Sequence, residues 1–129
     1  MSFLSATTIM MSAQAGAIAE PRPLTLAENG EIACIGAIAT IVAEERNLPG
    51  RASIAAEGQQ WAGIAGARIV QQSGQPRELV AVAMQSAAEA ERQRLSSLTD
   101  RDAQIARRLE ICTPMMRAAI AQGGGEVKP

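Results

Sequence analysis

Histidine and aromatic side chains are nearly missing from this sequence of 129 residues. It has no histidine and no tyrosine, with one tryptophan, Trp61, and one phenylalanine, Phe3. These absences exclude Ser-His-Asp triads and histidine metal sites, and they remove the aromatic platforms on which nucleic-acid bases stack. A formal net charge of −1 gives the chain no basic footprint for nucleic acid or for anionic membranes.

The composition is typical of one small globular domain built from helices. Hydrophobic residues make up 47% of the chain and charged residues 19%, whereas disordered chains are more charged and less apolar. Strand patterns are nearly absent, because β-branched and aromatic residues never alternate with polar ones for long. Alanine occupies 26 of the 129 positions. This predicts a thin core that gains stability from a covalent link or from a second chain.

Residues 1–19 resemble an export signal that lacks one part. A mostly apolar stretch, Phe3–Met11, is followed by two small-x-small cleavage patterns, at residues 13–15 and 17–19. The positively charged opening region is missing, because no lysine or arginine precedes Arg22. We expect export to the periplasm or the medium. The alternative is a disordered tail on a cytoplasmic protein.

The two cysteines, Cys34 and Cys112, are separated by 78 residues. This spacing is not that of a CxxC redox pair, and two cysteines alone do not complete a zinc site. An even number of cysteines in a small chain with an export pattern favours a structural disulfide. The alternative is two unlinked cysteines that act as small hydrophobic residues in the core.

Local signals divide the chain into a linker over 20–24, a helical domain over 25–121 and a flexible tail over 122–129. Thr25 and Glu28 form a capping-box pattern at the start of the first helix. Gly74 suits the left-handed position that ends the second helix. The periodicity of apolar residues predicts helices over about 26–46, 53–72, 76–95 and 100–121.

Short connections between these helices predict an all-α fold, an antiparallel four-helix up-down bundle. Pro114 is expected to kink or split the last helix. An antiparallel first and last helix would place Cys34 and Cys112 at similar heights, about 12 Å and about 14 Å along the bundle. The uncharged part of the first helix, 32–43, spans only about 18 Å, so the processed chain is not expected to cross a membrane.

The second helix has a surface of small residues that is compatible either with tight core packing or with a groove for a partner helix or an apolar ligand. Methionines from the later helices would add an adaptable apolar lining. The candidate partner or ligand surface consists of Gly58, Trp61, Ala62, Ala65, Gly66, Met84, Met115 and Met116.

Arginines on the last helix form a candidate anion patch, because guanidinium groups recognise carboxylates and phosphates well. Its members are Arg101, Arg107, Arg108 and Arg117. Neighbouring acids, Asp100, Asp102 and Glu110, offset much of this charge, so the alternative is an ordinary solvated helix face. No catalytic residue, metal site or cofactor site is predicted from the sequence.

These patterns favour a non-enzymatic, exported helical domain that acts through protein–protein contact, either with another protein or with a second copy of itself. The alternative function is a carrier of a small apolar ligand or lipid, held between helices near Trp61, Ala65, Met84 and Met116. An enzyme that uses arginine and acidic residues would require a deep cleft with converging charged groups. No nucleic-acid partner is expected.

Overall fold

The computed structural model describes residues 20–127, with side chains described for residues 20–123. The described part of the chain contains four helices and no strand, which confirms the predicted all-α four-helix fold. The predicted export signal, 1–19, lies outside the described residues. The helices are α2 (Leu26–Glu44), α3 (Arg51–Ser73), α4 (Arg77–Ser96) and α5 (Arg101–Val127).

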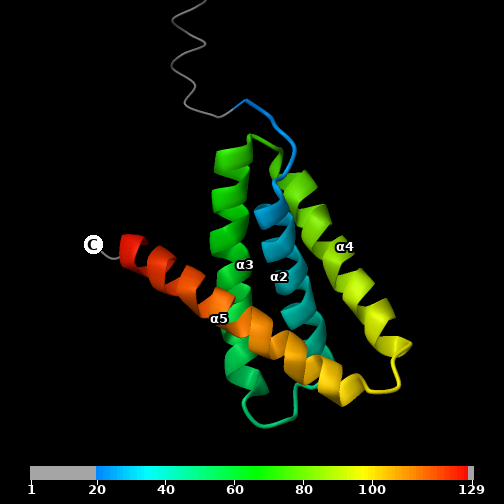
Figure 1. The fold of residues 1–129 in the computed structure, drawn as a ribbon. Coiled ribbons are helices and arrows are strands. Elements are labelled where there is room, and N and C mark those ends of the chain that lie inside the picture. The colour runs from blue at the N-terminus through cyan, green and yellow to red at the C-terminus, as the bar shows by residue number, and fades with distance from the viewer. Residues whose placement is uncertain (1–19, 128–129) are drawn as a thin grey trace, which may run out of the picture.

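The four helices alternate in direction, and α5 crosses obliquely in front of α2 and α3 (Figure 1). The central helix is α2, which packs most extensively against α4, a helix that runs parallel to it, and then against α3. Contact between α4 and α5 is slight. The molecule is therefore organised around α2, with the ends of α3 and α4 splayed apart at the bottom of Figure 1.

The start of α2 is fixed by the predicted capping box. The Glu28 amide donates to the Thr25 hydroxyl at 3.0 Å, and the Thr25 amide donates to the Glu28 carboxylate at 2.9 Å. Arg22 donates to both oxygens of the same carboxylate, each at 2.9 Å. The Arg22 amide also donates to the Ser73 carbonyl at 2.9 Å, so the segment before α2 is tied to the end of α3.

This cluster predicts an acid-sensitive contribution to stability. The hydrogen-bonded Arg22 guanidinium lowers the pKa of Glu28 from 4.5 to about 2. Because the folded-state pKa is the lower one, the stabilisation is present above pH 4.5 and is lost as the pH falls through about 2. Urea unfolding between pH 7 and pH 2 should show the advantage of wild type over Glu28→Gln shrinking across this range. The stability advantage of wild type over Arg22→Gln should shrink over the same pH range. A constant difference at every pH would contradict it.

Glycine allows α2 and α4 to approach each other closely. A Cβ atom added to Gly36 would lie 2.6 Å from the Ala88 nitrogen and 2.7 Å from the Ala87 carbonyl carbon, both backbone atoms of α4. One turn further along, the Thr40 hydroxyl donates to the Ala88 carbonyl oxygen at 2.9 Å. The backbone of α2 at Gly36 therefore lies directly against the backbone of α4 and the Ala87 methyl group.

The predicted disulfide links α2 to α5 at the centre of the core. The sulfur atoms of Cys34 and Cys112 lie 2.10 Å apart and their Cα atoms 5.4 Å apart. Beside them, Trp61 is fully buried, and its indole nitrogen donates to the Glu31 carboxylate at 2.9 Å. The main core cluster contains Ile32, Cys34, Ile35, Ile38, Trp61, Ala65, Ile69, Val80, Cys112 and Met116.

The last helix continues through Pro114 to Val127, so of the two outcomes predicted at this residue, a kink or a split, the split does not occur. A proline removes one helical hydrogen bond, and the buried Cys112 and Met116 on either side hold the two halves of α5 against the same core. The backbone of 122–127 is helical where a flexible tail was expected. There Gly123 packs closely on Ile64, because a Cβ atom at Gly123 would lie 2.9 Å from the Ile64 side chain.

The turns on either side of α3 use glycines in the left-handed region. Gly74 ends the helix with φ 72°, as predicted. Gly50 precedes the helix with φ 81°, so α3 begins at Arg51, two residues earlier than the sequence pattern indicated.

By length and hydropathy, α2 is the one helix among the described residues that could cross a membrane. Nine of its residues are buried within the bundle, including Ala37 and Ile41, which are fully enclosed. Burial of this kind is typical of the central helix of a folded core.

Candidate functional site

Three of the residues predicted to form a contact surface belong to the core. Trp61, Ala65 and Met116 each have an exposed fraction of 0%, so they cannot touch a partner without unfolding. The predicted surface is therefore corrected at these three positions, whereas Met84, the fourth residue named for the predicted pocket, is only partly buried. The helical spacing of the three buried residues reflects tight core packing, which the sequence left open as the alternative to a partner or ligand groove.

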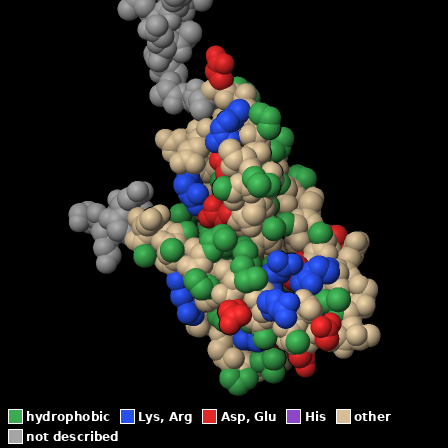
Figure 2. Space-filling model, viewed as in Figure 1, with side chains coloured by type: hydrophobic (Ala, Val, Ile, Leu, Met, Phe, Trp, Pro, Cys, Tyr) green, Lys and Arg blue, Asp and Glu red, His purple; other side chains and the backbone are tan. Residues whose placement is uncertain are grey.

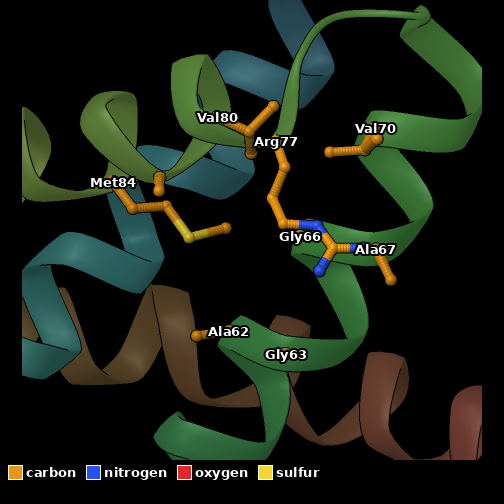
Figure 3. A pocket seen from close by; sticks show the side chains of 9 residues that line it. Ala62, Gly63, Gly66, Ala67, Val70, Arg77, Val80 and Met84 are labelled. Carbon is orange, nitrogen blue, oxygen red and sulfur yellow. The ribbon is translucent and has the colours of Figure 1, made fainter.

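Three other predicted residues come together on the surface. Ala62, Gly66 and Met84 line a groove between α3 and α4 (Figure 3). Gly58 lies outside it, in a second groove between α2 and α3. Met115 is partly exposed on α5, which lines neither groove. The predicted surface therefore includes three residues that line the α3–α4 groove and others that do not line it.

The α3–α4 groove has a volume of about 300 Å³ and a mainly apolar lining. It lies beside the turn that joins the two helices. The side chain of Arg77, from the first position of α4, extends across the groove toward Gly66 and Ala67 (Figure 3). The full lining is Ala62, Gly63, Gly66, Ala67, Val70, Arg77, Val80, Ala81 and Met84.

Two further grooves continue from this one and form a single surface. Ala62 lines both the α3–α4 groove and the α2–α3 groove. Ala39 and Ala43 line both the α2–α3 groove and a third groove between α2 and α4. No residue of α5 lines any of the three. We call this surface the alanine face and define it by Ala39, Ala43 and Ala62, the residues that connect the grooves.

The predicted anion patch on α5 is occupied by the protein's own carboxylates. Arg101 pairs with Glu44 of α2, and Arg117 pairs with Glu57 of α3 at 3.2 Å. Arg108 pairs with Glu91 of α4 at 3.2 Å. These three arginines therefore bridge α5 to the other helices, and they do not form a free anion site with the exposed Arg107. Acidic side chains accompany the basic ones on this side of the molecule (Figure 2).

Glu91 is the most enclosed carboxylate of this network, with an exposed fraction of 5%. Burial by itself would raise the pKa of Glu91. Hydrogen bonds from Arg94 at 2.9 Å and Arg108 at 3.2 Å outweigh that effect and hold the pKa below 4.5. The carboxylate is therefore charged and paired at neutral pH, which is typical of a structural bridge.

Within the part of the chain that the structure describes, no three histidine, cysteine, aspartate or glutamate side chains are grouped as metal ligands. The α3–α4 groove combines apolar side chains with one arginine, Arg77. No protein-family model, no curated protein and no solved structure matches this chain.

Proposed function

We propose that this protein is an exported, non-enzymatic helical domain that acts by receiving a helix of a partner protein on the alanine face. The observation that carries the proposal is the position of Ala39 and Ala43. Both lie on α2, the core helix, yet both are exposed, between the diverging ends of α3 and α4.

A helix is the partner element that such a surface suits best. Alanine side chains are short, so a second helix can approach α2 closely and gain van der Waals contact along its length. The splayed ends of α3 and α4 provide walls on both sides of that path (Figure 1). Gly58 and Ala55 extend the same smooth surface along α3.

The export part of the proposal is supported by two independent features. Residues 1–19 carry the apolar stretch and small-x-small patterns of a signal. Cys34 and Cys112 lie at disulfide distance, and disulfides persist in oxidising compartments such as the periplasm. The non-enzymatic part is supported by the lack of histidine and of any catalytic motif in the sequence.

Site-specific photocrosslinking in the native cells tests the contact. A photoreactive residue at position 39 should give one discrete adduct, and Ala43→Arg in the same chain should abolish it. The matched control is the same photoreactive residue at position 106, an exposed alanine on α5, which should give no such adduct. The proposal fails if position 39 gives no adduct, or if both positions give the same adducts regardless of Ala43→Arg.

The same preparation tests export through its intact mass, measured without reductant. We expect a chain that lacks residues 1–15 or 1–19 and that is lighter by two further hydrogens, because Cys34 and Cys112 are joined. A full-length chain with two free thiols would place the protein in a reducing compartment.

The α3–α4 groove favours a second candidate function, the carrying of a small apolar ligand. Its volume of about 300 Å³ lies at the lower end of the range for ligand pockets, about 300–1,000 Å³. Trp61 does not line this groove and is fully buried. Its fluorescence would therefore report on a bound ligand only indirectly, and direct binding measurements are required.

A further inference from the structure

We infer that the α3–α4 groove binds a single-chain amphiphile with a terminal carboxylate, whose apolar chain lies on the groove floor and whose carboxylate pairs with Arg77. This inference rests on the carrier function named above, and it adds the chemical class of the ligand and the residue that selects it. It does not require a partner helix, although Ala62 lines both this groove and the adjoining groove of the alanine face.

The floor of the groove is open because two glycines of α3 contribute no side chain. A Cβ atom at Gly63 would meet nothing within 4 Å, and one at Gly66 would lie 3.6 Å from the Met84 methyl carbon. Val70 and Val80 close the end of the groove nearest the turn. Methionine adapts its shape to an apolar ligand readily, so Met84 can follow a flexible chain laid along the floor.

Arg77 differs from most arginines of the domain because it has no carboxylate partner among the described residues. Eight other arginines are paired with glutamates: Arg22, Arg51, Arg68, Arg92, Arg94, Arg101, Arg108 and Arg117. Arg46 and Arg107 also lack an ion pair in the described part of the chain, yet neither lines one of the three grooves. Arg77 alone combines an unmatched charge with an apolar groove.

A carboxylate is the complement of this arrangement. The guanidinium group offers parallel N–H donors that match the two oxygens of a carboxylate. Arg77 is also the first residue of α4, and the partial positive charge of a helix N-terminus adds to the attraction of an anion there. The adjacent acid, Glu78, does not line the groove.

The dimensions and charge of the site favour one free chain. A groove of about 300 Å³ with one arginine at its edge suits a ligand with one apolar chain and one charged group. Binding to an anionic bilayer would draw on a wider basic surface, whereas the whole chain has a net charge of −1.

Calorimetric titration of the full, disulfide-bonded chain with three ten-carbon probes tests the inference. The probes are decanoate and decyltrimethylammonium, each used below its micelle concentration, and decanol, used below its solubility limit. We expect decanoate to bind up to about five-fold more tightly than decanol, because Arg77 is exposed and an ion pair at an exposed site contributes modestly. Arg77→Gln should remove this preference and leave the affinity for decanol unchanged. Arg107→Gln, which removes an arginine outside the groove, should change nothing.

A groove-filling substitution locates the bound chain. A Cβ atom at Gly63 would meet nothing within 4 Å, so Gly63→Leu should place its side chain in the groove and abolish binding of all three probes while the unfolding midpoint is kept or raised. Gly30→Leu is the matched control on α2, where a Cβ atom also meets nothing within 4 Å, and it should leave binding intact.

Each remaining outcome overturns a defined part of the proposal. Equal affinity for all three probes, unaffected by Arg77→Gln, would overturn the carboxylate selectivity and leave the carrier function standing. Binding that survives Gly63→Leu would show that the groove is not the site. The absence of binding by any probe would overturn the carrier function together with this inference.

Discussion

Removing the Cys34–Cys112 link is expected to destabilise the oxidised protein by about 4 kcal/mol. The bond closes a loop across a sequence separation of 78 residues, and loop closure on this scale removes much of the entropy of the unfolded chain. For a domain of this size, that loss corresponds to a fall in Tm on the order of 15 °C. This contribution is a large share of the total stability because alanine-rich helices bury little area per residue, so the core has few other large contributions.

The double substitution Cys34→Ala/Cys112→Ala isolates this contribution, because alanine avoids leaving an unpaired hydroxyl in the core. Thermal unfolding of the variant should match that of wild type refolded in reductant, and both should melt well below the oxidised protein. Circular dichroism measures all three. Identical melting curves for oxidised and reduced wild type would show that the link contributes nothing to stability.

The sequence was informative where a short stretch of residues determines the structure. The capping box is determined by two residues three positions apart, Thr25 and Glu28. The left-handed end of α3 is determined by a single residue, Gly74. The link between Cys34 and Cys112 is long-range, and it was predicted from the even number of cysteines and the export pattern, with the similar heights of the two residues as a consistency check. The two helix ends depend on local geometry, and periodicity is sufficient to place four helices.

The sequence was uninformative where the outcome depends on which helices meet. An up-down bundle places neighbours in sequence side by side, yet the most extensive packing joins α2 to the parallel α4. The glycine that permits it, Gly36, lies in an apolar run where nothing marks it as a contact. The partners of Arg101, Arg108 and Arg117 come from other helices, so neighbouring acids in the sequence gave no indication of them.

The candidate site also contains residues that the sequence predicted and one that it did not. Ala62, Gly66 and Met84 were predicted as an adaptable surface, and they line one groove. Trp61 and Met116 were predicted as part of the same surface but face the core. Arg77 was missed because a lone arginine after Pro76 reads as an ordinary exposed helix start. The signal that distinguishes it, a charge without a partner beside an apolar groove, exists only in three dimensions.

The second large effect is expected at the α2–α4 contact. Gly36→Ala should destabilise the protein by about 2 kcal/mol, because overpacking a tight contact costs about 1–3 kcal/mol. The added Cβ atom would lie 2.6 Å and 2.7 Å from backbone atoms of α4, and a backbone cannot rotate away as a flexible side chain can. The two helices must therefore separate, which weakens the Thr40–Ala88 hydrogen bond one turn away.

Gly30→Ala on the same helix provides the matched control. Its Cβ atom meets nothing within 4 Å, so the higher helix propensity of alanine should stabilise the protein by up to about 1 kcal/mol. The same substitution in one helix should thus have opposite signs six residues apart, which urea unfolding can measure. If Gly36→Ala and Gly30→Ala both stabilise the protein, then α2 and α4 do not make close contact at Gly36.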